Sequence, residues 1–255
     1  MTKAAAVVCG PSVAARVLAV LSSFDETHTA LTLSDIARRS KLPLSTTHRL
    51  LAELERWQAV DRAEDGAYHI GRRLWQLGTL APVQRELREV ALPAMQDLFV
   101  ATQENVTLAV LSGTSALYVE RIHGKASVPV ESRPGRPLPL HATGVGKVLL
   151  AHAQPGLVDA CLSKLTKVTS FTIVDRERMC CELAAVRRNG YARSFEEMTP
   201  GVAAIAVPIF DPEGRVLAAL GLVTRILRKD LVKFVPALRV AAATISRNVS
   251  HHRAG

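Results

Sequence analysis

The first seventy residues contain three short amphipathic segments separated by polar breaks. Pro11-Ser12 is a helix start, and apolar side chains from Val13 to Phe24 then recur on one face at helical spacing. A second helix begins at Thr32, whose hydroxyl can cap it, and it ends before Pro43, which disfavours helical geometry at the preceding residue. The third helix is expected over Ser45–Trp57. Its inward face holds four large apolar residues, Leu50, Leu51, Leu54 and Trp57.

The second and third helices together form a helix-turn-helix pattern, in which the second of the two helices opens with small hydroxyls and a basic residue. Hydroxyls at a helix N-terminus reach phosphates and base edges, and the helix dipole favours the anionic DNA backbone. Arg49, one turn into the helix, can donate two hydrogen bonds to a guanine edge in the major groove. The residues expected to contact DNA are Ser34, Ser45, Thr46, Thr47, His48, Arg49 and Arg62.

A hairpin is predicted after the third helix. Two short strands flank Glu64-Asp65-Gly66, and Asp-Gly is a strong hairpin signal. Arg62 then lies where the wing of a winged helix-turn-helix approaches the DNA backbone. A different three-helix bundle with a hairpin could share the pattern, but order, spacing and turn type seldom agree by chance. We therefore expect a flexible tail over residues 1–11 and a winged helix-turn-helix domain over residues 12–71.

The rest of the chain changes from helical to alternating periodicity. Residues 72–101 keep helical spacing and are expected to form a helical linker, which either pairs two subunits or packs on its own chain. From Asn105 the apolar residues alternate, so residues 106–121 read as an antiparallel hairpin. Further strands are expected at 128–131, 191–194, 202–210 and 216–223, and helices at 141–152, 157–165, 175–190 and 231–249. Helices inserted between strands without strict alternation make residues 102–255 an α+β domain.

Composition limits the possible classes of protein. The formal charge of +9 favours a polyanionic partner, but residues 1–80 contribute only +2 of it, so bulk charge does not locate a DNA-binding surface. Four cysteines, at positions 9, 161, 180 and 181, form no CxxC pair and are expected to be reduced thiols. The N-terminus lacks the apolar core of a signal peptide, and no apolar stretch is long enough to span a bilayer. We expect a cytoplasmic protein that does not associate with membranes.

Two sets of motifs resemble one family. The run Leu33-Ser-Asp-Ile-Ala-Arg-Arg, the run Leu42-Pro-Leu-Ser-Thr-Thr-His-Arg-Leu-Leu-Ala-Glu-Leu and the segment Tyr68-His-Ile-Gly71 are similar to the isocitrate lyase regulator (IclR) family of bacterial transcription regulators. Leu138-Pro-Leu-His-Ala-Thr-Gly-Val-Gly-Lys147 and Gly201–Asp211 are similar to the family's GAF-like effector domain. The resemblance covers residues 12–249. One departure is Lys41, where the family usually has Gly, so the turn is expected to differ slightly here.

The resemblance implies where a small ligand would bind. In family members that bind organic acids, the residues matching Gly144 and Val145 touch the ligand, and polar side chains at the positions of Ser194 and Ala204 help to hold it. Alanine at position 204 weakens that polar anchoring. Leu138, Val130 and Val202 are expected to line the same cavity, which is then mostly apolar and suits a larger or more hydrophobic acid, such as an aromatic one.

An enzyme is the competing class. His141–Lys147 resembles a phosphate loop, but His141 and Val148 occupy positions that need Gly and Ser or Thr. The Gly-containing segment can then be either an ordinary helix start or a carboxylate site at a helix N-terminus. Cys180-Cys181 has no evident His partner, and Glu196-Glu197 fits a charged loop better than an acid–base pair. An aromatic content of 4% disfavours RNA binding by base stacking.

The sequence therefore predicts an effector-responsive regulator with no catalytic residue, metal site or cofactor. We expect a homodimer or homotetramer that inserts two recognition helices into a pseudo-palindromic double-stranded DNA operator. The alternative is a metabolic enzyme that carries an accessory DNA-binding head.

Overall fold

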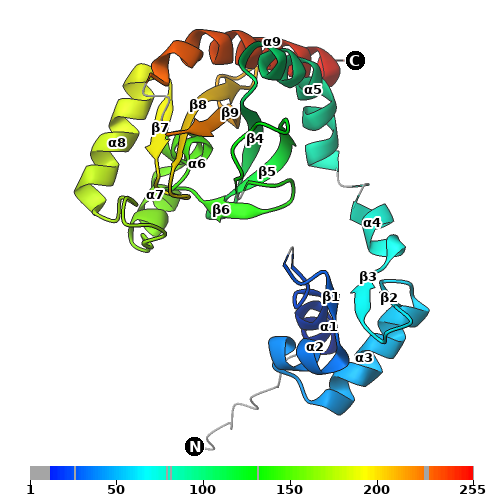
Figure 1. Ribbon diagram of the computed structural model, residues 1–255. Coiled ribbons are helices and arrows are strands. Elements are labelled where there is room, and N and C mark those ends of the chain that lie inside the picture. The colour runs from blue at the N-terminus through cyan, green and yellow to red at the C-terminus, as the bar shows by residue number, and fades with distance from the viewer. Residues whose placement is uncertain are drawn as a thin grey trace, which may run out of the picture. The chain divides into compact units, whose positions relative to one another are not determined.

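The computed structural model describes residues 12–25, 27–78, 80, 82–130, 132–226 and 230–254. The chain divides into two compact units, residues 1–82 and 83–255, and each is described by itself (Figure 1). The tail expected over residues 1–11 lies outside the described residues.

The first unit combines a helical bundle with a small sheet. Its elements are α1 (Val13–Leu21), β1 (Ala30–Leu31), α2 (Leu33–Ser40), α3 (Leu44–Arg56), β2 (Val60–Arg62), β3 (Tyr68–Ile70) and α4 (Arg72–Gly78). The sheet is antiparallel in the order β1-β3-β2, so the predicted hairpin gains a third, short strand that the sequence analysis did not foresee. Its core is formed mainly by Val20, Leu31, Ile36, Leu50, Leu51, Leu54, Val60 and Tyr68.

The starts of α1 and α2 are the predicted ones, whereas α3 begins one residue earlier than predicted, at Leu44. The Ser12 hydroxyl accepts a hydrogen bond from the Ala15 N–H at 3.1 Å, and the Thr32 hydroxyl accepts one from the Asp35 N–H at 3.2 Å. The prediction that Trp57 lies on the buried face is wrong. Helix α3 ends at Arg56, and the Trp57 ring is 41% exposed with the Arg73 guanidinium 4.5 Å from its centroid.

Lys41 forms the turn between α2 and α3 in a left-handed conformation, with φ 56° and ψ 35°. This is the backbone geometry that glycine adopts most easily. Lys41 therefore adopts a backbone conformation that is strained for a residue with a side chain.

The second unit is built on one six-stranded sheet. Its strands are β4 (Asn105–Ser112), β5 (Ser115–Ile122), β6 (Pro137–Pro139), β7 (Ala192–Phe195), β8 (Val202–Phe210) and β9 (Val216–Arg225). Its helices are α5 (Pro82–Thr102), α6 (Gly144–Ala151), α7 (Pro155–Leu162), α8 (Arg176–Asn189), the 3-10 helix η1 (Val232–Phe234) and α9 (Val235–Ala254). All pairings are antiparallel, in the order β6-β5-β4-β9-β8-β7.

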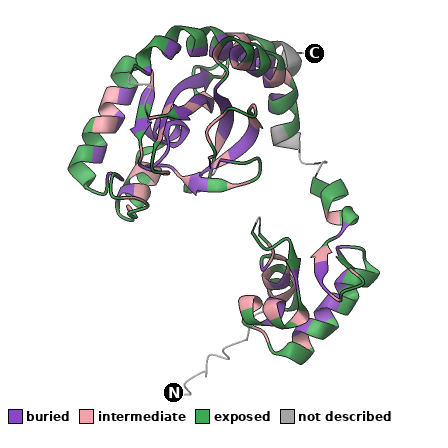
Figure 2. Cartoon of the chain, in the orientation of Figure 1, coloured by how far each residue is buried: buried purple, intermediate pink, exposed green. Residues whose placement is uncertain are grey.

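The two faces of this sheet are covered by different helices. Helices α5 and α9 pack on one face, where alternate residues of β8 such as Ile205 and Val207 join their core. Helices α6 and α8 cover the other face, on which Ala206 lies. Figure 2 shows the buried strands enclosed between these helices. The part of α5 from Leu87 to Leu98 thus belongs to the core of the second unit, since Leu87, Ala91, Met95 and Leu98 are buried there.

One predicted strand is wrong. Val128–Val130 is not part of a strand, and Glu131 lies outside the described residues. The strand that pairs with the outer edge of β5 is instead β6, through Ala116 opposite Leu138. The predicted helix at 141–152 begins three residues later, at Gly144, because Thr143 is its cap.

Candidate functional sites

Helix α3 presents a polar face. Ser45, His48 and Arg49 are exposed and Thr46 is half-buried, while the leucines of the opposite face form the core. Within the described residues, the Arg49 guanidinium has no ion pair or hydrogen bond, whereas Arg56 at the far end of the helix pairs with Glu53. Arg49 is therefore free to donate to another molecule.

The N-terminus of α3 has free backbone donors. Its N-cap residue is Pro43, which provides no capping side chain, and the first backbone N–H bonded at this end is that of Thr47, to the Pro43 carbonyl. The N–H groups of Leu44, Ser45 and Thr46 precede the first intrahelical bond. They form a partial positive charge that suits a phosphate.

Thr47 does not belong to the polar face. Its side chain is fully buried, and its hydroxyl donates to the Pro43 carbonyl at 3.1 Å. The prediction that Thr47 contacts DNA is therefore wrong for its side chain, because the helical repeat directs it into the core beside Leu50 and Leu51.

Ser34 and Arg62 are exposed on other elements of the first unit. Ser34 lies in the first turn of α2, and Arg62 ends β2. The Arg62 guanidinium stacks 5.5 Å from the centroid of Tyr68, and its Nη2 would lie 3.6 Å from a Cβ placed on Gly66. Arg62 thus folds over the tip of the wing and holds its charge there.

The second unit contains a cavity between the sheet and the N-terminus of α6. The space between its lining atoms is about 480 Å³, part of it open to solvent. All seven residues predicted to bind a ligand line it: Val130, Leu138, Gly144, Val145, Ser194, Val202 and Ala204. The other lining residues are Thr107, Tyr118, Ser132, Ala142, Thr143, Met198, Thr199, Ile205, Gly221, Leu222 and Val223. No lysine, arginine or histidine is among them.

The N-terminus of α6 provides backbone donors to this cavity. The Thr143 hydroxyl caps the helix by accepting from the Gly146 N–H at 3.1 Å. Within the described residues, the N–H groups of Gly144 and Val145 have no hydrogen-bond partner, and both residues line the cavity. An eight-residue helix with two free N–H groups facing an apolar space can hold a carboxylate.

Small residues make room around this helix start. A Cβ on Gly144 would contact the Ala204 Cβ at 3.4 Å, and a Cβ on Gly221 would meet the Val145 Cγ1 at 2.9 Å. Gly221 is therefore required for α6 to lie this close to the sheet. Ser194 is buried, and its hydroxyl donates to the Ala142 carbonyl at 3.1 Å, which ties β7 to the segment before α6.

The cavity also has polar groups that the sequence analysis missed, among them Thr107, Tyr118 and Ser132. Burial raises the pKa of the Tyr118 phenol, and a hydrogen bond with Thr143 partly offsets this rise, so Tyr118 stays neutral. Alternation along the predicted strands could have assigned Thr107 and Tyr118 to one face. No local signal identifies Ser132, which lies outside any strand.

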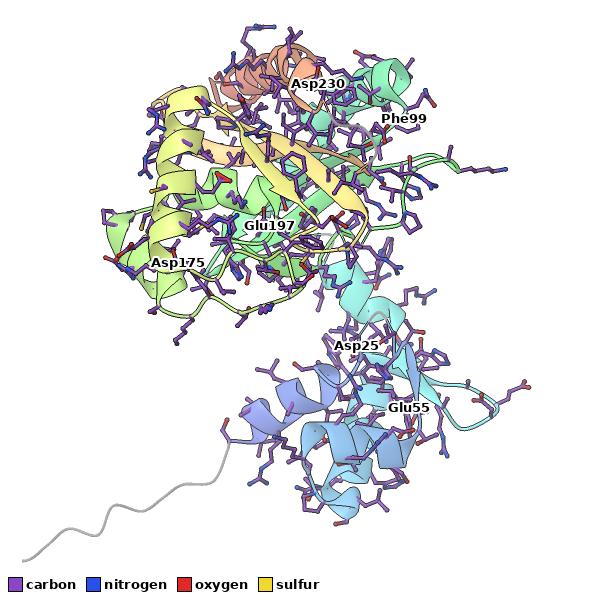
Figure 3. All side chains as sticks on the ribbon, turned by 60° about the vertical axis from the view of Figure 1, so that its left-hand side comes forward. Asp25, Glu55, Phe99, Asp175, Glu197 and Asp230 are labelled. Atoms are coloured by element: carbon purple, nitrogen blue, oxygen red, sulfur yellow. The ribbon has the colours of Figure 1, made fainter. Side chains whose placement is uncertain are left out.

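A buried ion pair links α6 to the loop after β7, where Glu197 lies (labelled in Figure 3). Lys147 on α6 is fully buried, and its Nζ lies 2.6 Å from Glu197 Oε1 and donates to the Arg193 carbonyl at 3.1 Å. Glu197 follows β7 in the loop that contributes Met198 and Thr199 to the cavity wall. The pair therefore joins α6 to that wall.

The groups weighed for an enzyme have other surroundings. Cys180 and Cys181 are exposed on α8, and Glu197 is committed to Lys147. Burial raises the pKa of the Cys161 thiol, which makes it a poor nucleophile. Within the described ranges, no group of three or more His, Cys, Asp or Glu side chains could hold a metal ion. None of the helices in the described part of the chain is long and apolar enough to cross a membrane.

Family models match both units. The IclR helix-turn-helix domain matches residues 13–64, and the C-terminal domain of the bacterial transcriptional regulator IclR matches residues 80–247. XynR, an HTH-type transcriptional regulator of Escherichia coli, is 35% identical over 242 residues, covering 92% of this chain and 96% of XynR. KipR, an HTH-type transcriptional regulator of Bacillus subtilis, is 30% identical over 227 residues, covering 87% of this chain and 91% of KipR.

Solved structures agree with this assignment. The crystal structure of an IclR homologue from Microbacterium hydrocarbonoxydans, complexed with 4-hydroxybenzoate, has a TM-score of 0.89 at 38% identity. The match covers 96% of this chain and 100% of that one. A transcriptional regulator from Rhodococcus has a TM-score of 0.80 at 31% identity, covering 93% of this chain and 98% of that one.

The winged helix-turn-helix, the antiparallel sheet domain and these relatives define a DNA-binding transcription regulator. The chain belongs to the IclR family.

Proposed function

We propose that this regulator binds a pseudo-palindromic operator through α3 and that an aromatic monocarboxylic acid, bound in the cavity of the second unit, changes its affinity for that operator. The single observation that carries the DNA-binding part is the exposed, unpaired Arg49 on a helix whose N-terminal N–H groups are free. Ser34, Ser45, Thr46 and His48 contact phosphates or base edges beside it, and Arg62 contacts the backbone from the wing.

An aromatic acid suits the cavity for two reasons. The Gly144 and Val145 N–H groups can hold a carboxylate, and the remaining walls are largely apolar, with Leu138, Val202 and Ala204 among them. The Microbacterium relative, which is 38% identical, was crystallised with 4-hydroxybenzoate. This supports an aromatic acid over a short aliphatic one.

Association of two or four copies is supported by apolar surface on the first unit. Trp75 in α4 is 68% exposed and Leu80 is 70% exposed, and Leu77 is exposed between them. Exposed large apolar side chains favour association with another copy, which removes them from water. A homodimer would place two α3 helices on successive major grooves, and a tetramer would pair two such dimers. We infer that the assembly acts in the cytoplasm, where its DNA lies.

The effector acts by linkage. It changes operator affinity only as far as its own affinity differs between the DNA-bound and the free form of the protein, and DNA changes effector affinity by the same factor. We propose that residues 72–101 carry this coupling between the two units.

The test of DNA binding compares two arginines of one helix. We expect Arg49→Ala to lose binding to the operator, found by selection from random duplexes, while Arg56→Ala keeps it, since Arg56 already pairs with Glu53. A fluorescence-anisotropy titration measures both affinities, and circular dichroism checks that both variants are folded. Equal affinity of Arg49→Ala and the parent protein would refute the assigned role.

The effector and the enzyme alternative are tested together. Calorimetric titration of the full chain with benzoate is expected to show saturable binding, and repeating it with operator DNA should give a different affinity. Chromatography of the same mixture should recover benzoate unchanged, because we propose no catalytic turnover. Steady conversion of the acid would favour an enzyme instead.

A further inference from the structure

Among the described residues that line the cavity, one buried residue has a hydroxyl without a hydrogen-bond partner. Three side-chain polar atoms in the described part of the chain are buried without a hydrogen bond: Ser132 Oγ, Glu197 Oε2 and Thr224 Oγ1. Ser132 alone among these three residues lines the cavity, and it is only 4% exposed. Burying a hydroxyl without a partner costs free energy, so such a group in a ligand cavity indicates that the ligand supplies the missing bond.

The other buried hydroxyls of the cavity already have partners inside the protein. Thr143 donates to the Pro139 carbonyl, Ser194 to the Ala142 carbonyl and Thr107 to the Gly221 carbonyl at 3.4 Å. The phenol of Tyr118 is hydrogen-bonded with Thr143. The remaining hydroxyl, that of Thr199, belongs to a half-buried residue. Among these lining residues, Ser132 is therefore the buried one whose hydroxyl has no partner within the described part of the chain.

Ser132 and the carboxylate site belong to different ends of the cavity. The Ser132 carbonyl accepts a hydrogen bond from Arg121 Nη1 of β5 at 3.0 Å, which holds this segment near β5. Gly144, at the N-terminus of α6, lies against Ala204 of β8. In the strand order β5-β4-β9-β8 these two strands are separated by β4 and β9, so Ser132 and the N-terminus of α6 line different parts of the cavity. A ligand that reaches both groups therefore carries them at opposite ends.

From this arrangement we propose that Ser132 is a specificity-determining residue, which selects an aromatic acid bearing a hydroxyl at the ring position opposite its carboxylate. This rests on the proposed function, in which the carboxylate binds the Gly144 and Val145 N–H groups. The phenol hydroxyl and the Ser132 hydroxyl each donate and accept, so one hydrogen bond forms between them with no change in charge. The serine compensates for Ala204, which removes a polar contact near the carboxylate end.

The test uses three probes on the full chain: benzoate, 2-hydroxybenzoate and 4-hydroxybenzoate. One net hydrogen bond predicts that 4-hydroxybenzoate binds about fivefold to tenfold more tightly than benzoate. In 2-hydroxybenzoate the hydroxyl is next to the carboxylate, so its affinity should equal that of benzoate. Isothermal titration calorimetry gives the three dissociation constants.

Two variants distinguish a specific role of the Ser132 hydroxyl from a general effect of removing a buried hydroxyl. Ser132→Ala should bind 4-hydroxybenzoate and benzoate equally, and benzoate binding shows that the variant is folded. Thr224→Val removes another unpaired buried hydroxyl, outside the cavity lining, and should keep the preference.

Three outcomes would overturn the inference. If Ser132→Ala retains the preference, or if the parent protein binds benzoate and 4-hydroxybenzoate equally, Ser132 does not select the hydroxyl and the proposed function still stands. If none of the three acids binds, the proposed aromatic effector is wrong and this inference fails with it.

Discussion

Replacing Lys147 by methionine is the sharpest test of how the cavity wall is held. The change removes the charge but keeps an unbranched apolar side chain in a site where Lys147 is fully buried. Glu197 then loses its partner at 2.6 Å, and its second oxygen, Oε2, has none already. The nearest other carboxylate, Glu182 at 3.8 Å from Nζ, is partly exposed and can turn to water.

The expected loss of stability follows from the Glu197 carboxylate, which stays buried without its partner. Removing one member of a buried ion pair costs about 3–5 kcal/mol. For a unit of this size the melting temperature should fall by roughly 6–20 °C.

Differential scanning calorimetry on Lys147→Met, Glu197→Leu and the double variant measures this. The double variant removes both charges and should recover most of the loss, since an apolar pair is often as stable as a buried ion pair. A loss below about 1 kcal/mol in Lys147→Met, or a double variant as unstable as the two single losses combined, would show that the pair is not a coupled buried unit.

Three further changes test other features. Lys41→Gly should raise the free energy of unfolding by up to about 1 kcal/mol in urea titrations, because φ 56° strains a lysine but not a glycine; a decrease would mean that the lysine side chain stabilises the turn. Gly221→Ala should cost about 1–3 kcal/mol and abolish benzoate binding, since the new methyl would lie 2.9 Å from Val145 Cγ1; unchanged stability would show that α6 shifts freely. A hydrogen bond from the Thr32 hydroxyl lowers the pKa of Asp35, and one from Arg38 has the second largest effect. The stability that Asp35 contributes is therefore present above pH 3.8, its ordinary pKa, and is lost as the pH falls through the lowered pKa. Acid unfolding followed by circular dichroism should therefore be less steep for Asp35→Asn than for the parent protein, and identical profiles would contradict this.

Features that depend on neighbouring residues could be predicted from the sequence. The caps at Ser12 and Thr32, the wing turn at Gly66 and the helix stop at Gly190 are all formed by residues within a few positions of one another. Local hydrogen bonds and backbone preferences decide such features, so they can be read along the chain. The family resemblance also placed seven residues that the tertiary structure brings around one cavity.

The errors arise where contacts between elements, and not local periodicity, decide burial and pairing. Thr47 was assigned to the exposed face of α3 but is buried, and Trp57 was assigned to the buried face but is exposed. Helix α3 ends at Arg56, the residue before Trp57. Val128–Val130 has the composition of a strand, but Pro137–Pro139 takes the place beside β5. Periodicity gives the type of an element, whereas its ends and its pairing depend on competing contacts.

The sequence by itself determined the two kinds of domain, the polar face of the recognition helix and the presence of a helix after residue 140. Only the tertiary structure decided that Lys147 and Glu197, fifty positions apart, form a buried pair. It also decided that Ser132 keeps an unpaired hydroxyl in a cavity whose lining extends from Thr107 to Val223. The physical reason is that desolvation and hydrogen-bond satisfaction are set by all the atoms surrounding a group, and most of those atoms come from distant parts of the chain.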